Sequence, residues 1–419
     1  MEMKKCKFIS ANEYCVRVFD GTHDSPKPCE KGYKLLTSKN ILAGELDKTS
    51  AYYISENDYN DINQRSKVQQ YDILFSMIGS VGNVCFVKDS NIDFAIKNMG
   101  VFSCENKEKA LYLYYYLQSP FAKKMIDSYL NGAVQKFLGL ERLRNFPILE
   151  YSTDKQKIAA VLSSLDDKIA LNKKINAKLE AMAKRLYDYW FVQFDYPDKN
   201  GKPYKTSGGK MVWNEVLKRE IPEGWEVGKI GDLFESQAGF AFNSAKWTET
   251  GHPVLTIKNI HSDGTISFDN TSFIESYDDK LEKYTVNNGN MIFAMSGNTI
   301  GKVGIISSSI ENVLINQRVL IIKSSTSDIA FSYFIVSNPN VQNLVFQLGA
   351  NSAQPNISED EFRKIKICIP NKQFISKFNF QLKSFFDEVI SNRIQIQKLT
   401  NLRDRLLPLL MNGQVEVEG

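Results

Sequence analysis

The chain has 419 residues, of which 43% are hydrophobic and 24% are charged, and this balance excludes a disordered or fibrous protein. Its net charge is +4, from 52 basic against 48 acidic residues, which permits a nucleic-acid partner but does not require one. The length predicts two or three domains, each large enough to bury a core.

Compartment and membrane association can be judged from the same sequence. No apolar run approaches the roughly 18 residues that a membrane span needs, so we expect no membrane insertion. The six cysteines are scattered without a Cys-x-x-Cys pair, and the chain does not open with a basic segment followed by an apolar stretch. These features favour a reducing cytoplasm.

A repeat organises the chain. Lys39 in LLTSKNI matches Lys258 in VLTIKNI, and Gln135 matches Gln354, both at an offset of 219 (258 − 39 and 354 − 135). The segment YDILFSMIGSVGNV also aligns with GNMIFAMSGNTIGKV. Because the offset is constant across more than half of each copy, the sequence predicts a tandem duplication.

Each copy begins with a mixed domain, at residues 1–150 and 221–370. Short β-branched runs such as NVCFV and KVGII alternate with Gly, Asn and Ser turns, which is typical of strand-rich α+β domains. The segments ALYLYYYLQSPFAKKMIDSYL and DIAFSYFIVSNPNVQNLVFQL have a helical pattern, and their aromatic residues should pack in the core against the sheet.

A long helix is predicted after each domain, within 151–196 and 371–419. Apolar residues recur at alternating intervals of three and four, which indicates a coiled-coil seam, and neither helix is apolar all round, so each needs a partner. The seam residues are Ile158, Leu162, Leu165, Ile169, Leu179, Ala183, Leu186 and Trp190, then Phe378, Leu382, Phe385, Val389, Ile396, Leu399, Leu406 and Leu410. Prolines and glycines in the linker at 197–220 prevent the first helix from continuing.

An asparagine lies on each seam, at Asn172 and Asn392, with an offset of 220 (392 − 172). Each amide needs a polar partner, so it lowers stability but penalises slipped registers, and we predict that both residues set the register. Replacing either by leucine should raise helix stability and loosen the register. At 1.5 Å per residue, a helix from Lys155 to Phe191 spans on the order of 55 Å, roughly one and a half turns of B-DNA. The alternative is that the helices merely dimerise the protein.

Motifs for catalysis are absent from the sequence. The run from Gly297 to Lys302 has three residues between its glycines and is followed by Val303, whereas a P-loop needs four residues and then Ser or Thr after the lysine. The sequence contains no Asn/Asp-Pro-Pro-aromatic motif of an adenine methyltransferase. Three isolated histidines are too few for a convincing zinc site or catalytic triad. We therefore expect no catalytic residues and no metal site.

The chain resembles the specificity subunits of type I restriction-modification systems over nearly its whole length. The motifs that carry the resemblance are DGTHDSPKP, LLTSKNI, RSKVQQYDILFSMIGSVGNV, AMSGNTIGKVG and NQRV, with the joining segment from WFVQFDYP to GWEVGKIGDLF. Because these independent motifs follow the expected order, the resemblance is specific. It implies an α+β fold with two target-recognition domains in a pseudo-two-fold tandem repeat, separated by two long antiparallel coiled-coil spacer helices.

The resemblance also implies a function. Each domain would read one half of a bipartite, asymmetric site in double-stranded DNA, and the helices would set the unspecified spacer. The chain would dock two modification (methyltransferase) subunits, which use S-adenosylmethionine to methylate adenine N6. Restriction subunits, which are translocases and nucleases that use ATP and magnesium, would complete the complex. The chain itself is expected to bind no cofactor.

Candidate DNA-contacting residues lie in the matched motifs, because base edges are read by Arg, Lys, Asn, Gln, Ser or Thr on groove-facing loops. In the first domain they are Thr22, His23, Lys39, Asn40, Arg65, Lys67, Ser80 and Gln135. In the second they are Phe242, Ser244, Lys258, Asn259, Asn298, Lys302, Gln317, Arg318 and Gln354. Shared Lys-Asn and Gln positions cannot distinguish two half-sites, so they favour backbone contacts or scaffolding. Base readers should lie where the copies diverge, at 22–28 and 241–247.

Two other classes of function stay open at this point. An enzyme with its own modification or cleavage activity would show turnover by the isolated chain. A helical structural adaptor would use its globular domains to bind protein, and it would show no salt-sensitive, sequence-selective DNA binding.

Overall fold

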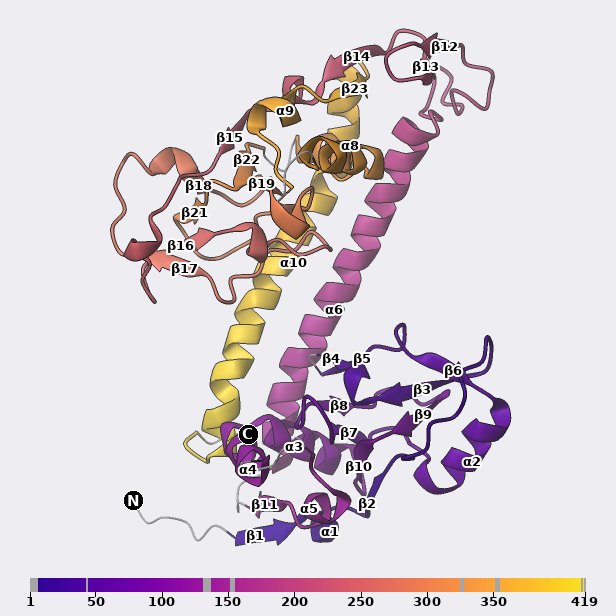
Figure 1. Ribbon diagram of the computed structural model, residues 1–419, viewed down its shortest axis with the longest axis vertical. Helices are drawn as coiled ribbons and strands as arrows, with labels where there is room; N and C mark the ends of the chain where they lie inside the picture. The colour runs from indigo at the N-terminus through magenta and orange to yellow at the C-terminus, as the bar shows by residue number, and fades with distance from the viewer. Residues whose placement is uncertain are drawn as a thin grey trace. The chain divides into compact units, whose positions relative to one another are not determined.

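The computed structural model describes residues 7–42, 44–130, 137–150, 155–324, 328–350, 355–415 and 417. The chain forms two compact units, one of Met1–Lys168 with Leu399–Gly419 and the other of Ile169–Lys398. Each unit contains one globular domain and a stretch of each long helix, α6 (Lys155–Tyr187) and α10 (Lys372–Met411) (Figure 1). The two compact units divide both long helices, whereas the sequence places the domain limits at the ends of those helices. The limits from the sequence stay predictions.

The first domain is built on small sheets covered by helices. An antiparallel sheet has the order β2-β10-β7-β8, and a second sheet has the order β6-β3-β9, in which β3 and β9 are parallel. The strands are β1 Lys7–Ser10, β2 Arg17–Asp20, β3 Tyr33–Thr37, β4 Ile41–Leu42, β5 Glu45–Leu46, β6 Tyr52–Ile54, β7 Ile73–Ser76, β8 Val84–Phe86, β9 Phe94–Lys97, β10 Met99–Ser103 and β11 Pro147–Glu150. The helices are η1 Ser38–Asn40, α1 Ala11–Tyr14, α2 Glu56–Ser66, α3 Lys107–Gln118, α4 Pro120–Leu130 and α5 Leu140–Arg144.

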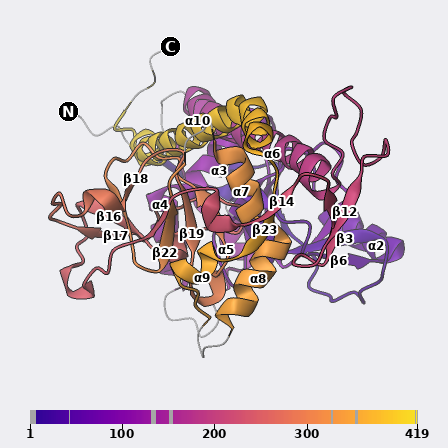
Figure 2. The same cartoon turned by 90° about the horizontal axis from the view of Figure 1, so that it is seen from above.

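The second domain repeats this plan. Its sheets have the orders β15-β22-β19-β20 and β17-β16-β21-β18, and helices α7 and α8 pack against the first of them (Figure 2). The strands are β14 Glu226–Lys229, β15 Ser236–Ala238, β16 His252–Leu255, β17 Ser272–Ile274, β18 Thr285–Val286, β19 Met291–Ala294, β20 Val303–Ile305, β21 Val313–Ile315, β22 Val319–Ile322 and β23 Lys366–Ile369. The helices are η3 Ile230–Asp232, η4 Ser244–Lys246, η5 Ile257–Asn259, η6 Glu282–Tyr284, η7 Gly297–Thr299, α7 Ile329–Val336, α8 Pro339–Gly349 and α9 Glu359–Arg363.

The register of the strands confirms the tandem duplication. Lys7 of β1 pairs with Glu150 of β11, and Glu226 of β14 pairs with Ile369 of β23, so the position of each partner shifts by the same 219 (226 − 7 and 369 − 150). The parallel pair β3–β9 recurs as β16–β21. The two domains therefore share one frame, and equivalent positions can be compared directly.

The central strand of each four-stranded sheet is buried on both faces, which explains its continuous apolar sequence. In β7, Ile73 and Phe75 face the helices, whereas Leu74 faces the smaller core beneath β9. The segments expected to be helical form α3, α4, α7 and α8, and Tyr112, Tyr116 and their neighbours are buried as expected. An Asn106 side chain caps α3 by accepting from the backbone N–H of Lys109.

Helices α6 and α10 run in opposite directions within each unit. In the first unit, Ile158 and Leu162 of α6 lie in one core with Leu410 and Met411 of α10. In the second, Trp190, in the π-helical turn Asp188–Val192 (η2) that continues α6, packs on aromatic rings near the start of α10. A hairpin of β12 (Met211–Asn214) and β13 (Arg219–Pro222) lies in the linker after α6. In the part of the chain that the structure describes, no helix is long and apolar enough to cross a membrane.

Candidate nucleic-acid interface

The shared Lys-Asn motif forms the same turn in both domains. In the first, the Oδ1 of Asn40 accepts from the backbone N–H and the hydroxyl of Thr37, at 2.8 and 3.1 Å. Its Nδ2 donates to the carbonyl of Asp47 and the hydroxyl of Ser50, at 2.9 and 3.1 Å. These four bonds satisfy the carboxamide, which is 4% exposed, while the side chain of Lys39 points into solvent.

The second domain reproduces this network. The Oδ1 of Asn259 accepts from the N–H and hydroxyl of Thr256, and its Nδ2 donates to the carbonyl of Ser267 and the hydroxyl of Thr271. Lys258 is exposed beside it, like Lys39 in the first domain. The asparagine therefore holds the turn together from inside, and the lysine is the member of the motif that can reach a phosphate.

Replacing Asn259 by alanine should lower the free energy of unfolding of the second unit by about 2–4 kcal/mol, because several buried partners lose their hydrogen bonds at once. Thermal or urea unfolding of the purified chain measures this loss. The matched control is Lys258→Ala, an exposed neighbour that should change stability by at most about 0.5 kcal/mol. Equal stability of the two variants would contradict the structural role of Asn259.

A hollow of about 690 Å³ lies next to the turn in the first domain. It brings together the candidate residues Lys39, Asn40 and Ser80, with Ile78 and Asn98 also on its wall. Ser80 and Ile78 are exposed on the loop after β7, where Gly79 has a φ of 75° that favours glycine. Segments far apart in the sequence therefore form one concave, partly apolar surface.

The turn after β2 carries Thr22 and His23 beside this hollow. The imidazole of His23 lies between two side chains, with its Nδ1 2.8 Å from the Oδ1 of Asn98 and its Nε2 3.0 Å from the Oδ2 of Asp20. The guanidinium of Arg65 in turn lies 3.6 Å from Asp20 and donates to the carbonyl of Gly21 at 3.2 Å. His23 and Arg65 are thus fixed around one buried carboxylate.

The remaining first-domain candidates differ in exposure. Thr22 is buried, and its hydroxyl accepts from the backbone N–H of Asp24, so it stabilises the turn. Lys67 is exposed at the end of α2. Gln135 and its counterpart Gln354 lie outside the described residues.

The second-domain candidates gather around the equivalent turn. The loop bearing the exposed Asn298 packs against the loop bearing Lys258. The contact is close at Gly297, where a side-chain Cβ would lie 3.4 Å from Ile257. Gln317 and Arg318 are exposed in the turn between β21 and β22, whereas Lys302 is half-buried before β20.

In the segment where the two copies diverge, the second domain carries aromatic side chains. The ring of Phe242 lies 5.0 Å from that of Phe240 and 6.2 Å from that of Trp247, and the exposed Ser244 begins the short helix η4 between them. The backbone N–H of Gln317 donates to the carbonyl of Phe240 at 2.9 Å. The aromatic loop therefore borders Gln317.

Sequence reasoning did not name Asn98 or Phe240. The repeat could have found Asn98, because the offset of 219 leads from it to the candidate Gln317 (317 − 98). Phe240 occupies the place of Thr22, because its carbonyl accepts from the N–H of Gln317 as that of Thr22 accepts from the N–H of Asn98, and it lies just before the segment that was singled out.

The two seam asparagines both have polar partners on the other helix. Asn172, with no exposed surface, donates from Nδ2 to the Oε1 of Gln395 at 2.6 Å. Asn392 donates to the Oδ1 of Asn176 at 3.0 Å, and Asn176 donates to the carbonyl of Val389 at 3.3 Å. The Oδ1 of Asn172 has no hydrogen-bond partner among the described residues.

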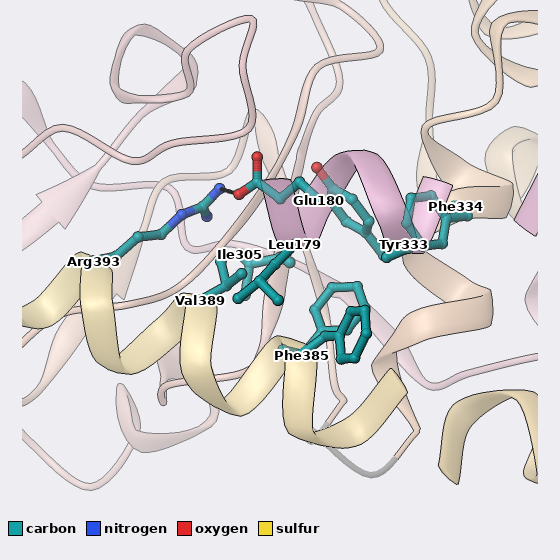
Figure 3. A pocket seen from close by; sticks show the side chains of 10 residues that line it. Leu179, Glu180, Ile305, Tyr333, Phe334, Phe385, Val389 and Arg393 are labelled. Atoms are coloured by element: carbon teal, nitrogen blue, oxygen red, sulfur yellow. Dashed lines mark hydrogen bonds and ion pairs between the residues drawn. The ribbon is translucent and has the colours of Figure 1, made fainter. Parts of the chain in front are cut away.

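An ion pair anchors the helices to the second domain (Figure 3). Arg393 of α10 donates to Glu180 of α6 at 2.9 Å and to the carbonyl of Gly264 in the domain at 3.2 Å. Burial raises the pKa of the Glu180 carboxyl, although the nearby guanidinium acts in the opposite direction. A cavity of about 30 Å³ beside the pair is lined mainly by apolar side chains, including Tyr333 and Phe385. Both helices are therefore fixed on this domain by packing and by charge.

Among the described residues, no group of three or more His, Cys, Asp or Glu side chains could hold a metal ion. The exposed candidates are instead cations, carboxamides and hydroxyls on loops around each turn. Such groups suit phosphates and base edges.

Comparisons with known proteins agree with this arrangement. A protein-family model described as "Type I restriction modification DNA specificity domain" matches residues 27–181 and 222–400. The type I restriction enzyme MjaIX specificity subunit of Methanocaldococcus jannaschii is 26% identical over 318 residues, covering 73% of this chain and 69% of the relative. The MjaVIII specificity subunit of that organism is 26% identical over 371 residues, covering 85% and 82%. The crystal structure of a type I restriction-modification S subunit from M. genitalium has a TM-score of 0.59 at 14% identity, covers 97% of each chain and shows the same fold.

Proposed function

Because this chain belongs to the type I restriction-modification DNA specificity family, we propose that each of its globular domains reads one half of a bipartite, asymmetric site in double-stranded DNA. The chain is the DNA-specificity component of such an enzyme and not a catalytic subunit. The observation that carries the proposal is the repeated frame: identical turns at Asn40 and Asn259 adjoin loops of different chemistry at 22–28 and 241–247. A shared scaffold with divergent loops suits the reading of two different half-sites.

We further propose that α6 and α10 form an antiparallel coiled coil that sets the spacer between the half-sites, with Asn172 and Asn392 fixing its register. The opposite directions of the helices within each unit support this role. So do the amide contacts, since a slipped helix would leave a buried amide without its partner.

Partner subunits would dock along these helices. Large apolar side chains stay exposed on them, including Leu171 at 50%, Met182 at 54% and Phe380 at 79%, and these support a protein-binding role. We propose that two modification subunits bind there with their S-adenosylmethionine, and that restriction subunits with ATP and magnesium join them. In this proposal the chain itself binds no cofactor.

The exposed lysines Lys39 and Lys258 should contact DNA phosphates. Replacing either by alanine in the partnered complex should weaken binding to all sequences and reduce the log–log salt slope by about 1, because one fewer counterion is released. Titration of labelled duplex at several salt concentrations measures the slope. Glu215→Ala, at an exposed residue of the β12–β13 turn, serves as the control for an altered surface charge. An unchanged slope in both lysine variants would contradict the phosphate role.

DNA binding by the complex separates the proposal from a helical adaptor whose domains bind protein. The specificity role predicts binding that prefers one duplex sequence and weakens steeply with salt. Binding that ignores sequence, or no binding by an assembled complex, would instead favour the adaptor.

A further inference from the structure

Equivalent positions in the two domains show where the reading surfaces differ. The N–H of Asn98 donates to the carbonyl of Thr22, and the N–H of Gln317 donates to the carbonyl of Phe240, so Asn98 corresponds to Gln317 (317 − 98 = 219) and His23 corresponds to Ala241. Asn98 lies in the turn from β9 to β10, and Gln317 lies in the turn from β21 to β22. In each domain this turn leads from the strand with a parallel partner to a strand of the antiparallel sheet. Only positions of this kind can distinguish two half-sites, because the frame around them is shared.

We propose that Asn98 reads a base in the half-site of the first domain, and that His23 is the residue that positions its carboxamide. This inference rests on the proposed function, since it assigns one contact within that DNA site. It also specifies what Asn98 selects, namely a base edge that offers a hydrogen-bond acceptor.

The backbone of Asn98 is fixed on the edge of the hollow. Its N–H donates to the carbonyl of Thr22 at 3.0 Å, and its own carbonyl accepts from the hydroxyl of Ser38 at 2.9 Å. The residue has a φ of 53°, a conformation that asparagine and glycine tolerate better than other residues do. Its side chain therefore projects from a rigid point on the wall of the hollow.

The carboxamide of Asn98 is oriented by its neighbours. Its Oδ1 faces the Nδ1 of His23, and that imidazole is held at its other nitrogen by Asp20. The Nδ2 of Asn98 has no hydrogen-bond partner among the described residues. The imidazole faces an oxygen at each nitrogen, so it can donate to both when both nitrogens carry a proton; in that form the oxygen of Asn98 is engaged and its nitrogen presents a donor to a ligand in the hollow.

A donor alone selects an acceptor on the base edge. In the major groove these are O6 and N7 of guanine, O4 of thymine and N7 of adenine, whereas cytosine offers only a donor; the two-bond contact to adenine would need the carboxamide oxygen as well. Ile78, which is exposed on the same wall, could also contact a thymine methyl group. Guanine, thymine and adenine share this acceptor chemistry and cytosine lacks it, and the recognised sequence distinguishes the three.

The second domain lacks this constraint. Ala241 stands where His23 stands and has no polar side chain, and the exposed Gln317 side chain has no hydrogen-bond partner among the described residues. Gln317 therefore keeps both its donor and its acceptor for a base. The same position in the frame thus offers different hydrogen-bonding patterns in the two domains.

The test is methylation-sensitive sequencing of DNA from cells that express the cognate modification subunit with the wild-type chain or a variant. Asn98→Gly removes the carboxamide and tolerates the positive φ, and we expect discrimination at one base position of one half-site to fall about 3- to 10-fold. Asn98→Asp presents acceptors only, so preference at that position should move towards adenine or cytosine. Asn312→Gly and Asn312→Asp are matched controls, because Asn312 is exposed with a φ of 52° in the other domain.

His23→Phe keeps a ring but removes both nitrogens, and it should relax the same base position as Asn98→Gly; it should also lower the thermal stability of the chain, because the buried carboxylate of Asp20 loses one of its partners. An unaltered motif in the Asn98 variants would overturn the assignment and leave the proposed function standing. So would loss of methylation at every site in an assembled complex, because Asn98 would then support the whole domain. The absence of any motif with the wild-type chain would contradict both.

Discussion

Inserting four residues after Lys173 in α6, with four matching residues after Arg393 in α10, is expected to lengthen the recognised spacer by about one to two base pairs. Four helical residues add roughly 6 Å, and B-DNA rises about 3.4 Å per base pair. The paired insertion keeps Asn172 with Gln395 on one side and Asn392 with Asn176 on the other. Neither half-site should change, because both globular domains are untouched.

The control places the same four residues after Val216, which is exposed in the turn of the β12–β13 hairpin, and it should leave the spacer unaltered. Sequencing of methylated DNA reads spacer length and half-sites together. If the paired helix insertion leaves the spacer at its original length in an assembled complex, the helices do not set it.

Replacing Asn392 by leucine should lower the free energy of unfolding by about 1–3 kcal/mol, because the change leaves the amide of Asn176 buried without its donor. Asn176 is 6% exposed, so water cannot readily take the place of that donor. The double variant Asn176→Leu with Asn392→Leu should recover most of the loss, since no unsatisfied amide is left in an apolar seam. Urea unfolding of the four chains in this cycle measures the coupling.

The matched comparison is Asn172→Leu, which should raise stability. Asn172 is wholly buried and its Oδ1 has no hydrogen-bond partner among the described residues, while its partner Gln395 is exposed and can bond to water instead. Equal effects of Asn172→Leu and Asn392→Leu would show that the amide contacts do not govern these positions. In both cases spacer fidelity should fall if the asparagines set the register.

The expectation that either leucine replacement would raise stability came from treating the two asparagines as equivalent. The sequence places both on a seam, but their partners depend on the stagger between two antiparallel helices. That stagger brings Asn392 against Asn176, which the seam pattern did not include, and Asn172 against the exposed Gln395. One sequence position therefore cannot show whether a buried amide has a buried or a hydrated partner.

The frame of the two domains was largely predictable. A constant offset between matching motifs indicated the duplication, and the same offset recurs in the strand register from β1 to β23. The β-branched runs NVCFV and KVGII indicated strands, and they form β8 and β20. Parallel pairing of β3 with β9 was not predictable, because it joins segments that lie far apart in the sequence.

The surface was harder to predict than the frame. The motif Lys39-Asn40 is contiguous in sequence, but the η1 turn directs the asparagine inwards and the lysine outwards, and only the fold separates those roles. Likewise, Asn98 becomes a candidate only when β9 and β10 bring it beside His23, which is 75 residues away in the chain. Sequence patterns identify elements, whereas a reading surface is assembled from loops that meet in space.

The most direct test of the central claim is methylation-sensitive long-read sequencing of DNA from cells expressing this chain with its cognate modification subunit, beside cells expressing that subunit alone. The account predicts a bipartite, adenine-methylated motif that appears only when this chain is present. A soluble, assembled complex that produces no such motif would contradict it, and the domains would then be better explained as protein-binding parts of a helical adaptor.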